Sequence, residues 1–185
     1  MIRVVLIFFS ALLAGAIIHI ATIFAIPFFA EGDIWHRALA LGPLHKIHTV
    51  SDPHEAVILS PDLDPTFAYG VCRVDVGAAP TLLKGQLPGD FWSLNYLDRR
   101  GRSQFSLTNQ ISGPKLNIVL ATKGQQRLLS ERPDLIDETT IVITASEQQG
   151  LLLVRAFVAS ERDRAKTADA IGRLSCGPLW KEDTF

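Results

Sequence analysis

The sequence predicts a mainly β protein, with a single N-terminal transmembrane helix followed by a β-sandwich or jelly-roll-like domain that carries one surface helix near the C-terminus. Three observations support this fold class. Residues 4–30 contain no charged side chain, residues 55–158 break into short apolar runs separated by Pro, Gly and Asp, and a helical pattern follows only after residue 160. Short strands with tight turns favour a sandwich over alternating strand–helix units. We therefore divide the chain into an anchor (1–30), a juxtamembrane helix and linker (31–54) and a β-rich globular domain (55–185).

The apolar N-terminus is long enough to cross a membrane. As a helix, residues 4–30 would extend about 40 Å, whereas the hydrocarbon core of a bilayer is about 30 Å thick. A cleaved signal peptide is the alternative, because Ala14, Gly15 and Ala16 imitate a cleavage site. The apolar run continues beyond that site to Ile26 and would leave an apolar tail on the mature protein. We therefore predict an uncleaved anchor, with the lipid bilayer as a partner.

A short juxtamembrane helix is expected over residues 33–41. Asp33 is a suitable N-cap, and Gly42 followed by Pro43 is typical of a helix end. Trp35 is expected at the headgroup level, where aromatic rings are enriched.

The following segment holds a set of metal-ligand residue types, namely His45, His48, Asp52 and His54. Three imidazoles and a carboxylate are suitable ligands for a metal ion. However, their spacing matches no established helical or hairpin ligand pattern. We therefore expect a polar linker here, with no metal and no cofactor, and keep these four residues only as candidates.

Turn signals such as LPGD, DRRG and EQQG separate the short apolar runs of the globular domain. The expected strands are residues 56–59, 66–76, 81–87, 91–97, 103–108, 115–122, 139–145 and 151–158. Near the end, Ser160 with Asp163 resembles a capping box, and Asp169 with Arg173 forms an i,i+4 ion pair on the predicted surface helix. Gly177 and Pro178 are expected to end that helix.

The stretch WSLNYLDRRGRSQFS, residues 92–106, is typical of a β-hairpin. Asp98 to Gly101 fits a type I turn followed by a G1 bulge. Arg99 and Arg100 would then lie at the exposed tip, and Arg102 would begin the return strand. Two interpretations remain open: a plain solvated turn, or a contact with anionic headgroups or with an acidic patch on a partner.

Two cysteines, Cys72 and Cys176, are too few for a disulfide framework or a cysteine-rich zinc site. If the domain is exported, they can form one disulfide. Two separate buried thiols are the alternative.

A formal net charge of −1 gives no overall field that attracts nucleic acid, so none is expected as a partner. The sequence also contains no G-x-S-x-G, H-E-x-x-H, Walker A or Rossmann glycine pattern. Two classes of function remain. The first is a non-enzymatic envelope module that binds a partner. The second is an envelope enzyme acting on a lipid or glycan through a site that no linear motif shows. The sequence does not decide whether the protein is an enzyme.

Three stretches together resemble a known family. They are DPTFAYGVCRVDV (64–76), LPGDFWSLNYLDRRGRSQFSLTN (87–109) and the closing LLLVRAFVAS with RLSCGPL. The chain resembles the bacterial domain-of-unknown-function family 1254, in its short, single-pass, membrane-anchored form.

This resemblance implies a β-sandwich or jelly-roll fold, a place in the bacterial inner membrane and a C-terminal domain facing the periplasm. Longer relatives carry a second domain of unknown function, numbered 1214, which is not seen before Phe185 here. The resemblance therefore implies a separately encoded companion protein as a partner. It implies no catalytic residue.

Overall fold

The computed structural model describes residues 1–30, 33–50, 55–56, 59–60, 63–88 and 90–180. The chain divides into two compact units, Met1–Asp33 and Ile34–Phe185. The juxtamembrane helix thus belongs, from Ile34 onward, to the same unit as the β-strands.

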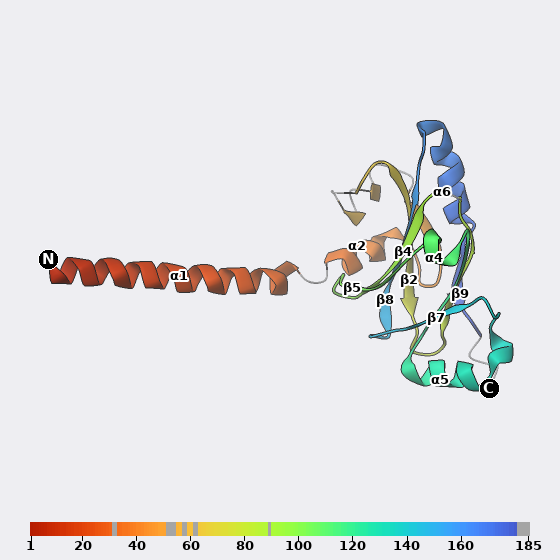
Figure 1. Ribbon diagram of the computed structural model, residues 1–185, viewed down its shortest axis with the longest axis horizontal. Helices are drawn as coiled ribbons and strands as arrows, with labels where there is room; N and C mark the ends of the chain where they lie inside the picture. The colour runs from red at the N-terminus through yellow and green to blue at the C-terminus, as the bar shows by residue number, and fades with distance from the viewer. Residues whose placement is uncertain (31–32, 51–54, 57–58, 61–62, 89, 181–185) are drawn as a thin grey trace. The chain divides into compact units, whose positions relative to one another are not determined.

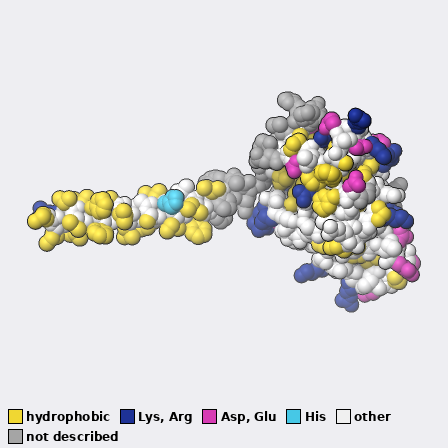
Figure 2. All heavy atoms as spheres, turned by 45° about the horizontal axis from the view of Figure 1, so that its top comes forward, with side chains coloured by type: hydrophobic (Ala, Val, Ile, Leu, Met, Phe, Trp, Pro, Cys, Tyr) yellow, Lys and Arg dark blue, Asp and Glu magenta, His cyan; other side chains and the backbone are white. Residues whose placement is uncertain are grey.

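The first unit is a single apolar helix, α1 (Ile2–Ala30), which continues past Pro27 (Figure 1). Its segment Ile2–Ile26 has a mean hydropathy of 2.6 in its most apolar window, and none of that window is buried. Figure 2 shows hydrophobic side chains along the visible face of this helix. The helix is long and apolar enough to cross a membrane, and a signal sequence near an N-terminus shares both properties.

The second unit is built on two sheets. Among the described residues, the strands are β1 (Ile47–Val50), β2 (Phe67–Asp75), β3 (Thr81–Gln86), β4 (Trp92–Asp98), β5 (Ser103–Thr108), β6 (Lys115–Ala121), β7 (Ile141–Thr144), β8 (Gln149–Phe157) and β9 (Ser175–Pro178). One sheet has the order β1-β2-β8-β4-β5 and the other β7-β6-β3-β9 (Figure 1). All pairs are antiparallel except β6 with β7. The parallel pair requires a crossover, which α5 (Lys123–Glu131) supplies.

The main hydrophobic core lies between the sheets. Alternate residues of β4 (Trp92, Leu94 and Tyr96) point inward and are fully buried with side chains of β6 such as Ile118 and Leu120. Side chains alternate in this way because successive residues of a strand point to opposite faces of the sheet. The predicted mainly β fold with a sandwich core is confirmed. Two helices cover the outer faces of this sandwich.

The outer face of the five-stranded sheet is also buried. Helix α2 (Asp33–Leu41) packs Trp35, Ala38 and Leu41 against it, beside Leu97 and Leu151. On the other sheet, α5 buries Leu129 in a third cluster. Strands covered on both faces need apolar residues at nearly every position, which explains the unbroken run of leucines in β8.

Helix α6 (Arg164–Gly172) is the predicted helix near the C-terminus, and its Ile171 is fully buried in the core. A side chain at Gly70 of β2 would overlap the Cγ2 atom of Ile171. Glycine lets α6 and β2 approach this closely, because any Cβ atom here would force Ile171 to move. The predicted pair of Asp169 and Arg173 is present, with a distance of 2.8 Å between Oδ2 and Nη2.

Several predictions were wrong in detail. Ala56 and Leu59 are helical rather than part of a strand. The Oγ atom of Ser160 donates to Asp163 Oδ2 at 2.7 Å and makes no cap with the helix backbone, so the capping box is not formed. A 3-10 turn, η2 (Glu161–Asp163), precedes α6 instead.

Two short edge strands were missed. β1 lies in the segment interpreted as a linker and pairs with β2 from Ile47↔Cys72 to Val50↔Tyr69. β9 contains Gly177 and Pro178, which were expected only to end a helix. A proline is tolerated there because β9 pairs with β3 alone, and an edge strand does not need every N–H group.

Candidate functional site

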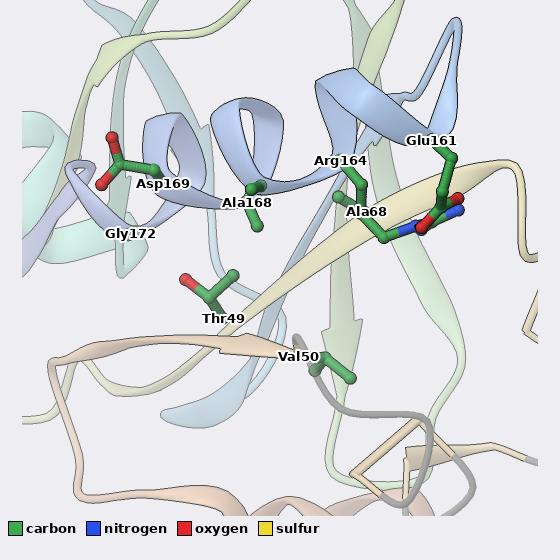
Figure 3. Close-up of a pocket in the computed structure, with 9 residues that line it drawn as sticks. Thr49, Val50, Ala68, Glu161, Arg164, Ala168, Asp169 and Gly172 are labelled. Atoms are coloured by element: carbon green, nitrogen blue, oxygen red, sulfur yellow. The ribbon is translucent and has the colours of Figure 1, made fainter.

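A groove of about 630 Å³ opens between α6 and the β1–β2 edge of the five-stranded sheet (Figure 3). Thr49 projects from β1 toward α6, and Ala168 projects from α6 toward β1. Glu161 and Arg164 lie together at one end, whereas Asp169 lies at the other. The described lining residues are Thr49, Val50, Ala68, Glu161, Arg164, Ala165, Ala168, Asp169 and Gly172.

Arg164 fixes the position of the first turn of α6. Its Nη2 atom donates to the carbonyl of Pro65 at 2.7 Å, and its Nε atom donates to Glu161 Oε1 at 2.7 Å. The hydrogen bond and the charge of Arg164 hold the pKa of Glu161 below its ordinary value. Both charged groups at this end are therefore engaged in holding the helix to the start of β2.

Small side chains make the floor of the groove. Ala68 and Ala168 take little space, and Gly172 leaves the Thr49 hydroxyl uncovered, since a Cβ atom there would lie 3.1 Å from Thr49 Oγ1. Among the described lining residues, Thr49 supplies the only hydroxyl, and no His, Cys or Tyr is present. Such a lining can bind an apolar surface with a polar edge, and its two carboxylates, Glu161 and Asp169, are both paired with arginines.

The predicted hairpin forms the connection between β4 and β5. Gly101 has a φ of 78°, in the left-handed region, and its N–H donates to the Asp98 carbonyl at 2.9 Å. The Asp98 N–H donates to the Arg102 carbonyl at 3.0 Å, which completes the expected bulge at Gly101, and a further register shift lies between Tyr96 and Leu97. The type of turn was therefore predicted correctly from Asp98 and Gly101.

Asp98 organises this turn from a buried position. Its Oδ1 atom accepts from the backbone N–H groups of Arg100 and Arg102 at 3.0 and 2.9 Å. Its Oδ2 atom accepts from Arg102 Nε at 2.8 Å and from Gln104 Nε2 at 3.0 Å. Burial opposes ionisation of Asp98, but the hydrogen bonds and the charge of Arg102 outweigh it and lower the pKa.

The three arginines of the hairpin thus have different surroundings. Arg102 is held by Asp98, whereas the Cζ atom of Arg99 lies 5.6 Å from the centre of the Trp35 ring. Arg73 of β2 also approaches that ring, at 5.8 Å, and donates to the Gly42 carbonyl at 2.7 Å. Trp35 is 6% exposed, because it packs on the sheet under these guanidinium groups.

The histidine-rich segment is not brought together as one cluster in the described residues. Asp52 and His54 lie outside the described residues. His48 Nε2 lies 3.3 Å from Glu55 Oε1, and the His45 ring contacts Thr81 Oγ1 at 3.4 Å on the side of β3. In the part of the chain that the structure describes, no group of three or more His, Cys, Asp or Glu residues is placed to hold a metal ion.

The backbone conformation and the surroundings of His45 were not revealed by the sequence. Its φ is 57°, unusual for a non-glycine residue, and its N–H donates to the Arg73 carbonyl at 2.8 Å. Burial lowers the pKa of His45, and nearby Asp75 partly offsets this. Although Thr81, His45 and Asp75 resemble a nucleophile–base–acid set, the Thr81 side chain is completely buried and cannot reach a substrate.

Cys72 in β2 and Cys176 in β9 are joined by a disulfide, with Cα atoms 6.6 Å apart. The bond connects the two sheets through the core, across a sequence separation of 104 residues.

These features define the class of this protein: a two-sheet β domain with a covered outer face, preceded by an apolar helix. Residues 42–178 match the family described as "Protein of unknown function (DUF1254)", so the chain belongs to that family. A search of the curated proteins found no match to this chain.

A solved structure shows the same fold. The VPA0106 protein from Vibrio parahaemolyticus superposes with a TM-score of 0.57 and 16% identity, over 83% of this chain and 37% of that chain. An uncharacterized protein from Burkholderia cenocepacia gives a TM-score of 0.48 and 13% identity, over 79% of this chain and 39% of that chain. This chain therefore spans well under half the length of either solved chain.

Proposed function

We propose that this protein is a binding module, anchored in the bacterial inner membrane with its β domain in the periplasm, that works with a companion protein. The groove between α6 and β1 is the binding site, and a segment of the companion is its occupant.

The composition of the groove is the observation that carries this proposal. Its floor is made of alanines, while Glu161 and Arg164 at its end are held by each other and by the Pro65 carbonyl. Charged groups that are already paired add little further affinity, and they are poor acids or bases for a reaction. An apolar floor with a polar rim is instead typical of a surface that recognises another molecule.

The length of a solved relative supports a protein as the occupant. In the VPA0106 protein the shared fold takes up 37% of the chain, so most of that polypeptide lies outside this fold. A domain that elsewhere is covalently joined to a larger remainder can bind the equivalent part as a separate chain. The two sequences share 16% identity, so the likeness between them is one of fold.

The disulfide supports the compartment. Disulfides persist in oxidising compartments such as the periplasm and are rare in the cytosol. A bond between Cys72 and Cys176, buried between two sheets, suits a domain that folds after export. An uncleaved α1 would then leave the domain tethered to the outer surface of the inner membrane.

Co-purification tests this function. The full chain is extracted gently from its native membrane, and the proteins recovered with it are identified by mass spectrometry. We expect a stable companion with the wild-type chain and its loss with Ala168→Phe, because a phenyl ring at this position fills the groove.

Ala170→Phe is the matched control: it lies on the same helix and does not line the groove. It should retain the companion, and equal thermal midpoints for the two variants would show that both are folded. Recovery of the wild-type chain alone, or equal recovery with both variants, would contradict the proposal.

A further inference from the structure

We propose that the surface made by α2 and the tip of the β4–β5 hairpin, hereafter the basic surface (Arg99 over Trp35, with Arg100 of the turn and Arg37 of α2), binds the anionic phospholipid headgroups of the membrane that holds α1. This inference rests on the anchoring part of the proposed function and does not involve the groove.

Chain connectivity keeps α2 near the end of the apolar helix. Helix α1 ends at Ala30, and α2 begins at Asp33. Three residues of fully extended chain reach at most about 11 Å. The first residue of α2 must therefore lie within about 11 Å of the last residue of α1.

The hairpin tip is fixed against α2. A Cβ atom on Gly101 would lie 2.8 Å from Ile34 Cγ2, so the turn and the helix are in direct contact. Trp35, Ala38 and Leu41 anchor α2 in a core cluster with Leu97 of β4. The arginines of the tip are distant in sequence from the anchor, and this packing brings them next to the residues that follow it.

Charge on the basic surface is predominantly positive. Asp98, the acidic residue of the turn, is buried and bonded to Arg102, whereas Arg99 and Arg100 are exposed. In α2, the residues after Asp33 contribute Arg37 and no acid. Including Glu31 and Asp33, segments 31–41 and 98–102 together with Arg73 hold five arginines and three acidic residues.

The stacking geometry suits phosphate recognition. The guanidinium of Arg99 lies over the indole of Trp35, which engages its flat face and orients its edge, where the N–H donors lie. An oriented guanidinium edge can donate two parallel hydrogen bonds to a phosphate. Leu39 of α2 is 47% exposed and offers an apolar contact on the same helix as Arg37. Charge and apolar area together are what an interfacial membrane contact uses.

Side-chain labelling in nanodiscs tests this inference. The full chain is inserted into discs of phosphatidylcholine, or of phosphatidylcholine mixed equally with phosphatidylglycerol, and treated with phenylglyoxal, which modifies arginine. Mass spectrometry then gives a rate for each arginine. In the anionic discs we expect the labelling rates of Arg99 and Arg100 each to fall by about fivefold. Both rates should recover in high salt, which screens the headgroup charge. Arg127 and Arg173, exposed on α5 and after α6, are internal controls that should not change.

A double variant tests whether the arginines of the hairpin tip themselves hold the basic surface at the lipid. In the variant Arg99→Ser/Arg100→Ser, Arg37 should no longer be protected from labelling by anionic lipid. In the control variant Arg127→Ser/Arg162→Ser, Arg37 should stay protected. Urea unfolding should be nearly unchanged in both double variants, since exposed arginines contribute little to stability.

Each remaining outcome would overturn the inference. Equal labelling of Arg99 in neutral and anionic discs would show that no headgroup is bound. Protection in native membranes but in neither kind of disc would identify an acidic protein as the partner. Failure of the chain to insert into discs would contradict the anchor as well, whereas insertion without protection would contradict the basic surface alone.

Discussion

A single buried carboxylate determines the geometry of the most basic turn in this protein. Asp98 accepts two backbone N–H groups and two side-chain donors, and these bonds place Arg99 and Arg100 at the exposed tip. The sequence identified Asp98 as a turn residue but did not reveal its burial. Asp98 alternates with Trp92, Leu94 and Tyr96 along β4 and so shares their inward face, where contacts between distant segments bury it. Periodicity alone does not report such contacts.

Asp98→Asn should lower the free energy of unfolding by about 2–3 kcal/mol at neutral pH, because hydrogen bonds to a charged acceptor are lost in a buried site. The folded pKa of Asp98 lies below its ordinary value of 3.8, so its stabilisation is present above that pH and is lost as the pH falls through the folded pKa. The difference in the free energy of unfolding between wild type and variant, measured with urea in detergent, should therefore shrink below pH 3.8. A difference that grows on acidification would contradict this role.

Among the elements, α6 forms one wall of the groove, and its contact with β2 depends on Gly70. Gly70→Ala should destabilise the domain by about 1–3 kcal/mol, because the added methyl group forces Ile171 to move. Gly177→Ala is the matched control, since no other atom lies within 4 Å of the point that its methyl group would occupy, and it should change stability little. The thermal midpoints of the two variants are compared. Equal midpoints would contradict the close approach of α6 to β2 at Gly70.

The elements also show how far sequence patterns extend. Strands with clear alternation or long apolar runs, such as β5 and β8, were predicted within two residues of their bounds. β1 has only four residues, including a histidine, and its pairing with β2 is non-local. The groove was not predictable for the same reason, since its walls come from Thr49, Ala68 and α6.

One missed element did have a local signal. Helix α5 begins with a capping box in which Gln125 N–H donates to Thr122 Oγ1 at 3.3 Å and Thr122 N–H donates to Gln125 Oε1 at 2.8 Å. The spacing of Thr and Gln is visible in the sequence, but the helix is polar and buries only Leu129, so no apolar stripe indicated it.

At the scale of the whole molecule, the disulfide joins the two sheets. Unfolded, non-reduced protein should contain no thiol that reacts with a maleimide, since the structure holds both cysteines in the bond. Reduction should lower the free energy of unfolding by about 2–5 kcal/mol, as expected for a link that closes a long loop. Two reactive thiols in protein from the native membrane would contradict both the bond and the proposed compartment.

The central claim is that the groove between α6 and β1 binds a companion protein, and photo-crosslinking in native membranes tests it most directly. A small diazirine residue replaces Ala165, an exposed residue on the groove lining, or Lys123, which is exposed on α5 as a control. The account predicts that irradiation joins the chain to a second protein from position 165 and not from position 123. Adducts confined to lipid or to the chain itself, or the same adducts from both positions, would contradict it.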